Sequence, residues 1–307
     1  MSKDIEQIMK NFTSLYTPEY MEQLSKQCYK DDREYPENFS NWYYNIQDFG
    51  KFKHPEIIAH QIFTYEELKI LQKWENIKDV NWTEYIQVLK PTLEKLEDYK
   101  IYNIKNGCFS NKFEFNTCIT NKFDLAENFW KIQYSSACFE TGGETELVVR
   151  EYIPYNKDDT VTIYNGMPLR TEVRVFYNMI TKQIEYVTDY WDYKYCIDNL
   201  HSLTDKVCFN YFHNKVIQSS DNVLQAIKHQ IELEDVIKYI NMNIHTLKFN
   251  DKLGQIYPIW SIDFMYDNTD NSVYLIDMAR GFRSAYWNPQ KVNKDTLQML
   301  KNREENN

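Results

Sequence analysis

The sequence contains little glycine and carries no excess of positive charge. Glycine accounts for only 7 of 307 residues, and 35 lysines and arginines are outnumbered by 45 aspartates and glutamates. The resulting formal charge of −10 argues against broad nucleic-acid binding, which needs a positive field around the protein. Few glycines are available for a phosphate-binding loop, and the Walker motif G-x-x-x-x-G-K is absent from the sequence.

The sequence also lacks long apolar runs, clustered cysteines and zinc-binding histidine motifs. No apolar run approaches the length that spans a bilayer, so we expect no membrane contact. The six cysteines lie far apart without a C-x-x-C pair, and the six histidines form no H-x-x-x-H or H-E-x-x-H pattern. These absences argue against zinc sites and a disulfide framework. Together with the polar start M-S-K-D-I-E-Q, they predict reduced thiols in a cytoplasmic protein.

The hydrophobic pattern predicts a globular α+β protein. Hydrophobic residues make up 43% of the chain, which is typical of globular proteins. Residues 1–95 are predicted to be mostly helical, because apolar residues recur at three- and four-residue spacing, as in T-Y-E-E-L-K-I-L-Q-K-W. Thr64 and Glu67 form a predicted capping box at the start of this segment. From residue 96 to 307, strand-like patterns and hairpins alternate with helices, which predicts mainly antiparallel sheets.

The stretch W-S-I-D-F-M-Y-D-N-T-D-N-S-V-Y-L-I-D-M-A-R-G-F, residues 260–282, is typical of a β-hairpin. If its loop comprises residues 268–272, Asp263 lies opposite Asp277 on the same face of the sheet. Two carboxylates at that distance repel each other and destabilise the hairpin. A divalent cation between them would relieve the repulsion, and Mg²⁺ prefers such oxygen ligands. The alternatives are a solvated aspartate at a strand end, or a different register.

A second cluster of charged residues lies on the predicted strand P-L-R-T-E-V-R-V-F-Y-N. Glu172 and Arg174 share one face of this strand, because side chains alternate with period two. The planar guanidinium of Arg174 could bind a phosphate, or the two residues could form a surface salt bridge. Lys105 and Lys112 flank the turn segment N-G-C-F-S-N, which could cover phosphates, although lysines near a turn are more often solvated.

The order of these pieces along the chain resembles the ATP-grasp superfamily. The resemblance rests on E-L-V-V-R-E-Y-I-P-Y, R-T-E-V-R-V-F-Y-N, W-S-I-D-F-M-Y-D and V-Y-L-I-D-M-A-R-G, and it covers roughly residues 99–290. Within the superfamily, the chain is most similar to the cell-division-cycle proteins that help to assemble eukaryotic translation initiation factor two. This resemblance implies an ATP-grasp-like nucleotide-binding region over residues 96–307, with ATP and Mg²⁺ as cofactors.

The resemblance also implies a role for each matching residue. Those expected to contact ATP are Lys105 and Lys112 at the phosphates, Arg150, Glu151, Tyr152 and Ile153 as the hinge at the adenine, Glu172 at the ribose, and Arg174 at the terminal phosphate. Arg174 and Lys112 would be the catalytic residues, and Asp263 and Asp277 would bind Mg²⁺. The sequence departs from the family pattern at Ala279, where an asparagine usually supplies a further metal ligand.

The function implied is that of an Mg-dependent ligase. Such an enzyme activates a carboxylate as an acyl phosphate, which an amine or another nucleophile then attacks. Two alternatives stay open, an ATP-binding assembly factor that acts on a protein partner with little turnover, and a nucleotidyl or phosphoryl transferase. Arg280 and Arg283 are candidates to bind phosphate or an acidic substrate, and each could equally be solvated.

Overall fold

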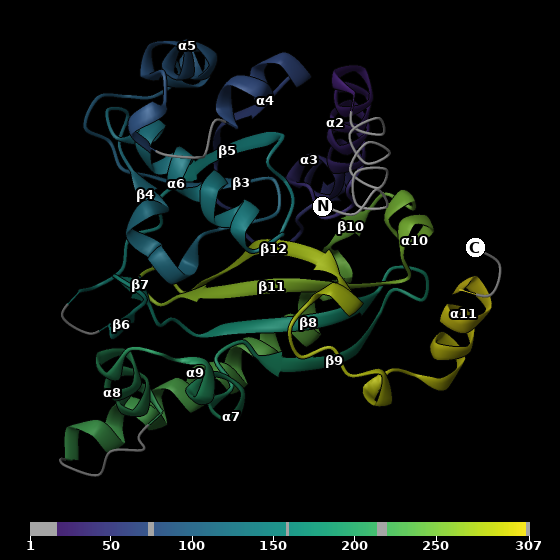
Figure 1. Ribbon diagram of the computed structural model, residues 1–307. Helices are drawn as coiled ribbons and strands as arrows, with labels where there is room; N and C mark the ends of the chain where they lie inside the picture. The colour runs from purple at the N-terminus through teal and green to yellow at the C-terminus, as the bar shows by residue number, and fades with distance from the viewer. Residues whose placement is uncertain (1–16, 73–76, 158–159, 214–219, 305–307) are drawn as a thin grey trace, which may run out of the picture.

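The computed structural model describes residues 17–72, 77–157, 160–213 and 220–304, and its centre is formed by two antiparallel four-stranded sheets (Figure 1). The upper sheet in Figure 1 has the order β2 (Ile57–Ile62), β5 (Glu146–Glu151), β3 (Tyr102–Asn106), β4 (Ile119–Thr120). The lower sheet has the order β12 (Ser272–Arg280), β11 (Ile259–Asp267), β8 (Glu172–Asn178), β9 (Gln183–Asp189). The predicted α+β class with antiparallel sheets is therefore confirmed.

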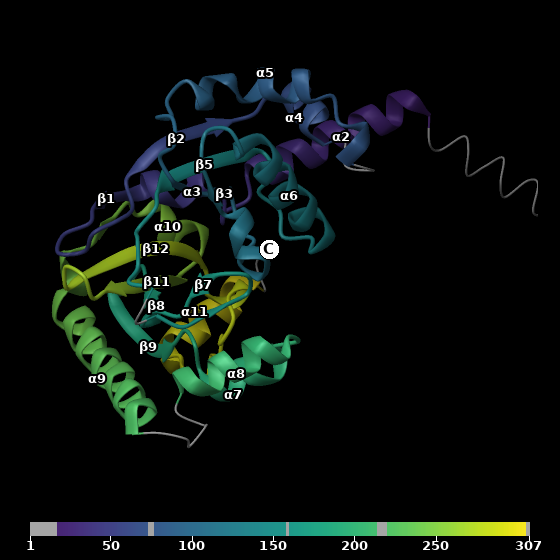
Figure 2. The same ribbon diagram turned by 90° about the vertical axis from the view of Figure 1, so that its left-hand side faces the viewer.

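Helices cover the outer faces of both sheets (Figures 1 and 2). The helices before residue 140 are α2 (Pro18–Arg33), α3 (Phe39–Trp42), α4 (Tyr65–Leu71), α5 (Trp82–Leu93) and α6 (Leu125–Cys138). Those after it are α7 (Tyr193–Cys196), α8 (Leu203–Phe212), α9 (Ser220–Asn243), α10 (Lys252–Ile256) and α11 (Lys294–Glu304). Two small sheets pair β1 (Ile46–Asp48) with β10 (Lys248–Phe249), and β6 (Thr162–Ile163) with β7 (Met167–Pro168).

Residues 17–95 are mainly helical, as predicted, and the first sixteen residues lie outside the described part. The predicted capping box is confirmed: the Glu67 amide donates to Thr64 Oγ1 at 3.3 Å, and the Thr64 amide donates to Glu67 Oε2 at 2.7 Å. This stretch also contains β2, which pairs with β5. Residues before and after position 95 thus contribute to one sheet, and the division of the chain at this point stays a prediction.

The hairpin of β11 and β12 places Asp263 opposite Asp277, which confirms the predicted pair. The loop is shorter than expected, however, because Asp267 already pairs with Ser272. A β-bulge between this end and the aspartates adds one residue, Ile276, to β12 and restores the predicted partner of Asp263. A bulged residue is left outside the regular ladder, so the carbonyl of Ile276 is free to accept from elsewhere.

Each sheet has its own apolar core. On the lower sheet, Val173 and Val175 of β8 pack with Val236 and Ile240 of α9. On the upper sheet, the inner residues of β3 and β5 pack with α4, α5 and α6. Because strand side chains alternate, the opposite face of β8 is turned away from α9 and toward the upper sheet. This face carries Glu172 and Arg174.

Candidate functional site

A row of charged residues crosses the lower sheet on the face that lies against the upper sheet. Arg174 of β8 is the register partner of Asp263 of β11, which is in turn the partner of Asp277 of β12. From the upper sheet, β3 contributes Lys105 and β5 contributes Arg150. The structure therefore brings five residues of the sequence-predicted site into one buried layer between the sheets.

Arg174 and Asp263 form a two-pronged ion pair. Arg174 Nε donates to Asp263 Oδ1 at 2.7 Å and Nη2 donates to Oδ2 at 2.7 Å, while Nη1 donates to the Ala285 carbonyl at 3.2 Å. Only 9% of Arg174 and 7% of Asp263 is exposed to solvent. Burial acts to lower the pKa of Arg174, but the adjacent Asp263 carboxylate outweighs it and holds this pKa above its usual value.

Lys105 pairs with the second aspartate. Its Nζ lies 3.0 Å from Asp277 Oδ1 and 2.9 Å from Oδ2. Arg150 reaches the same part of β12, where its Nη1 donates to the carbonyl of the bulged Ile276 at 2.8 Å. Each of the two opposed aspartates is thus neutralised by a cation from another strand. These ion pairs explain how the hairpin tolerates two facing carboxylates.

Lys112 differs from these cations because no carboxylate accompanies it. It begins a short 3-10 helix, Lys112–Thr117, and its Nζ donates to the Tyr190 hydroxyl at 2.7 Å. The same ammonium lies 4.8 Å from the centre of the Tyr190 ring. Burial acts to lower its pKa, but Tyr190 outweighs burial, so the pKa of Lys112 is raised. Among the described residues, Lys112 has no ion-pair partner within 4.0 Å.

Glu172 is buried beside these cations, with 5% of the residue exposed. Burial, and secondarily the nearby Asp263 carboxylate, raise the pKa of Glu172 to about 8. Glu172 is therefore mainly protonated at neutral pH. Its predicted alternative, a surface salt bridge with Arg174, is wrong, because both residues are buried and Arg174 pairs with Asp263.

A cavity of about 1080 Å³ opens onto this layer. Of the residues predicted for the site, Lys112 and Arg174 line it. Its aromatic lining consists of Phe113, Phe139, Tyr164, Tyr190, Trp191, Tyr195 and Tyr286. Its remaining wall comes mainly from α7, α8 and the connection between them. The cavity thus combines the cations Lys112 and Arg174 with flat aromatic surfaces, and the carboxylates Glu114 and Asp205 also line it. A ligand with both an anionic and an aromatic part would fit the wall that holds the two cations.

The predicted hinge, residues 150–153, lies outside the lining of this cavity. Arg150 faces β12, and the carbonyl of Ile153 accepts from Arg170 Nη2 at 2.6 Å. Glu151 and Tyr152 are partly buried, and the Glu151 carboxylate accepts from the Glu56 amide at 3.0 Å. The assignment of these four residues to an adenine stays a prediction.

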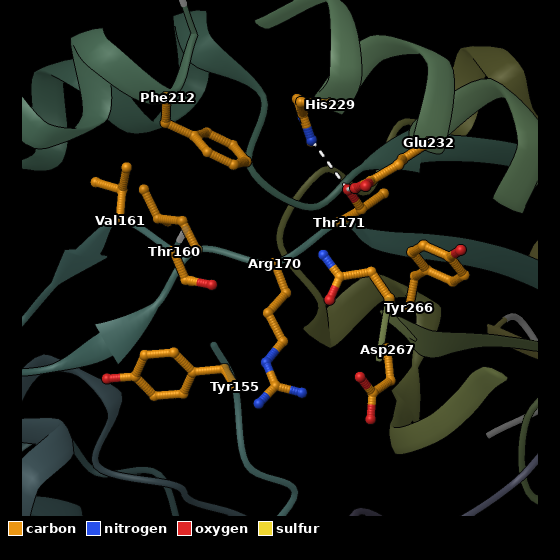
Figure 3. Close-up of a pocket in the computed structure, with 12 residues that line it drawn as sticks. Tyr155, Thr160, Val161, Arg170, Thr171, Phe212, His229, Glu232, Tyr266 and Asp267 are labelled. Carbon is orange, nitrogen blue, oxygen red and sulfur yellow. Dashed lines mark hydrogen bonds between the residues drawn. The ribbon is translucent and has the colours of Figure 1, made fainter. Parts of the chain in front are cut away.

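Arg170 lines a second, smaller pocket, of about 70 Å³. Figure 3 shows its guanidinium between Tyr155 and Asp267, on the opposite side of the pocket from Phe212 and His229. Its Nε is buried without a hydrogen-bond partner, and burial lowers the pKa of Arg170. Arg170 is not among the residues predicted from the sequence, although it lies two positions before Glu172, the spacing that puts strand residues on one face.

The oxygens of the predicted Mg²⁺ site are already bound by N–H donors. Both carboxylate oxygens of Asp263 accept from Arg174, and both of Asp277 accept from Lys105. Ala279, at the position of the usual third ligand, has no side-chain donor atom. Across the described ranges, no three His, Cys, Asp or Glu side chains form a group that could hold a metal ion. These residues therefore fit a resident divalent cation poorly.

The two arginines after β12 are held by the N-terminal part of the chain. Arg280 Nε and Nη2 donate to the Glu37 carboxylate at 2.6 and 2.9 Å. Arg283 Nη2 donates to the Tyr35 hydroxyl at 2.5 Å. Of the predicted alternatives, Arg280 is thus neither solvated nor free for a substrate.

Comparisons with known proteins find matches among solved structures. No family model and no curated protein matches the chain. Among solved structures, it is similar to Cdc123 from Schizosaccharomyces pombe, with a TM-score of 0.42 and 13% identity over 88% of this chain and 92% of that chain. A C-terminally truncated Cdc123 from the same organism gives a TM-score of 0.41 and 15% identity over 85% and 89%.

Among the residues that the structure describes, no helix combines the length and the apolar character needed to cross a membrane.

We predict that Arg174→Met destabilises the protein by about 3–5 kcal/mol, because it leaves the buried Asp263 carboxylate without its partner. The double variant Arg174→Met/Asp263→Leu should recover most of this loss, since it removes both charges. Urea unfolding measures both effects. The control Lys26→Met breaks an exposed helical pair with Glu22 and should change stability by less than about 1 kcal/mol. A loss below 1 kcal/mol in Arg174→Met would contradict the assignment.

We predict that Glu172→Gln stabilises the protein increasingly as the pH rises from 5 to 8. The fold raises the pKa of Glu172 from 4.5 to about 8, so between these pH values the folded wild type keeps a proton that the unfolded chain releases. The free energy of unfolding of the wild type therefore decreases between pH 5 and pH 8, by at most about 1.4 kcal/mol per pH unit. The glutamine variant lacks this decrease, because its side chain does not titrate. Urea unfolding at pH 5 and pH 8 tests this, with the exposed Glu234→Gln as control. Equal effects at both pH values would refute it.

Proposed function

We propose that the chain is an ATP-binding protein of ATP-grasp type whose phosphate site is the inner end of the large cavity. One observation carries this proposal: cations outnumber their paired carboxylates in the layer between the sheets. Lys105 and Arg174 are buried cations, Lys112 and Arg150 are partly buried cations, and the paired carboxylates are Asp263 and Asp277. In a chain of net charge −10, such a local surplus of positive charge favours an anionic ligand.

The energetics of buried charge support the same proposal. A cation that is withdrawn from water without an anionic partner is costly, and Lys112 is partly buried at the cavity wall with no ion-pair partner among the described residues. A phosphate group would supply the missing partner through charge-assisted hydrogen bonds. Arg174 lines the same cavity and adds a second positive charge beside Lys112. Both residues are those that the family resemblance assigns to phosphate.

The cavity also offers stacking surfaces for a nucleobase. The ring of Phe113 lies 5.1 Å from that of Tyr164 and 6.1 Å from that of Phe139, measured between centroids. Aromatic faces of this kind bind planar bases through stacking. The adenine could therefore contact this wall, while the resemblance assigns it to the hinge at residues 150–153.

We further propose that the nucleotide supports the binding of a protein partner with little turnover, as in the assembly factors that the sequence resembles. Ligase chemistry relies on well-placed metal ions. The lack of a ligand atom in the Ala279 side chain, and the ion pairs that occupy Asp263 and Asp277, therefore favour an assembly function over a ligase. Product analysis distinguishes the alternatives. Release of ADP and phosphate only with an added acceptor would indicate a ligase, and AMP with pyrophosphate would indicate a nucleotidyl transferase.

We predict that saturating ATP raises the melting temperature of the wild type by several degrees, since ligand at 100 times its Kd stabilises by about 2.7 kcal/mol. Lys112→Met should lose most of this shift, because it removes the ammonium group that we propose to bind the phosphates. A thermal unfolding series with ATP, ADP, AMP and GTP measures the effect. The matched control is Lys131→Met, which removes a lysine paired with Glu127 on α6 and should keep the shift. Failure of every nucleotide to shift the wild type would refute the proposed function.

A further inference from the structure

We propose that this chain binds its nucleotide without a divalent cation, and that lysine and arginine side chains alone neutralise the phosphates. This inference rests on the proposed nucleotide site and concerns how that site handles charge. It comes from the disagreement between the metal that the resemblance implies and the side chains that are present.

The first observation concerns the hydrogen bonds and the burial of Asp263. Both of its oxygens accept from Arg174 at 2.7 Å, in a pair of which each member is at least nine-tenths buried. A metal ion could bind this carboxylate only by displacing the guanidinium. Arg174 would then be a buried cation facing a divalent cation, which is strongly unfavourable. Asp263 is therefore a partner of Arg174 and unsuited to be a metal ligand.

The second observation concerns the oxygens of β12. Lys105, with 1% exposure, contacts both oxygens of Asp277, and the Met278 amide donates to Oδ1 at 3.0 Å. The neighbouring bulge carbonyl, of Ile276, accepts from Arg150. Ammonium, guanidinium and amide donors thus hold the oxygens that a cation would need. The Asp277 side chain keeps 33% exposure, but one carboxylate does not make a metal site.

The third observation is what stands in place of a metal. Mg²⁺ usually serves phosphate-binding proteins by neutralising the charge of the phosphates. Here the ammonium of Lys112 lines the cavity with one described hydrogen bond, to Tyr190, and its charge is not compensated by a carboxylate. Arg174 lies at the same wall. A protein cation therefore occupies the role that Mg²⁺ plays elsewhere.

Isothermal titration of the wild type with ATP, in EDTA and in excess Mg²⁺ at matched ionic strength, tests the inference. We expect ATP to bind in EDTA at least as tightly as in excess Mg²⁺, where the phosphates already carry the ion and attract the protein cations less. Binding at least tenfold tighter in Mg²⁺ would overturn the inference but leave the proposed function intact. Absence of binding under both conditions would refute the proposed function itself, so the two failures are distinguishable.

The variant Asp277→Asn separates two hypotheses, that Asp277 only pairs with Lys105 or that it binds a metal ion, because they predict different changes in ATP affinity. If Asp277 only neutralises Lys105, removing its carboxylate charge makes the layer beside the cavity more positive, and ATP should bind in Mg²⁺ as tightly as before or more tightly. A tenfold weaker Kd would show that Asp277 serves a metal and would overturn the inference. Circular dichroism confirms that the variant is folded. The matched control is Asp270→Asn, which removes a carboxylate paired with Lys53 at the surface and should leave ATP binding unchanged.

Discussion

The pairing of buried charges across strands is the constraint on which this structure depends. The two sheets meet along a face that carries Arg174, Asp263 and Asp277, and such a face could not be buried if these charges were left alone. Arg174 neutralises Asp263 within the lower sheet, and Lys105 neutralises Asp277 from the upper one. The second pair therefore also fixes how the sheets lie against each other. Lys112 has no ion-pair partner among the described residues, and on the proposed function a phosphate would supply that partner.

The same principle joins the N-terminal part of the chain to the sheets. Glu146 of β5 is fully buried and accepts from Arg33 Nη1 at 2.6 Å and from the Ser40 amide at 3.1 Å. Burial alone would raise the pKa of Glu146, but hydrogen bonds from His60 and Ser40 outweigh it and lower this pKa. Glu37 holds Arg280 in a comparable pair. Residues 33–40 thus supply partners for Glu146 of β5 and for Arg280 at the end of β12.

The sequence predicts the strand pairing better than it predicts the partners of the side chains. Period-two alternation and the turn residues were enough to place Asp263 opposite Asp277, even though the loop is shorter and a bulge at Ile276 makes up the difference. Whether those aspartates meet a metal or a cation depends on contacts between residues far apart in the chain. Lys105 is 172 residues from Asp277, and local patterns carry no information about such a pair. Arg170 was missed although its spacing from Glu172 is visible in the sequence, because its burial, which the sequence does not show, is what marks it as unusual.

A crystal structure of the chain grown with ATP and EDTA would test the central claim most directly. The account predicts phosphate oxygens within hydrogen-bonding distance of Lys112 Nζ and beside the Arg174 guanidinium, at the inner end of the cavity, with the Arg174–Asp263 pair still formed. Nucleotide bound away from Lys112, or an Arg174–Asp263 pair opened to bind it, would contradict the claim that this charged layer is a phosphate site built from protein cations.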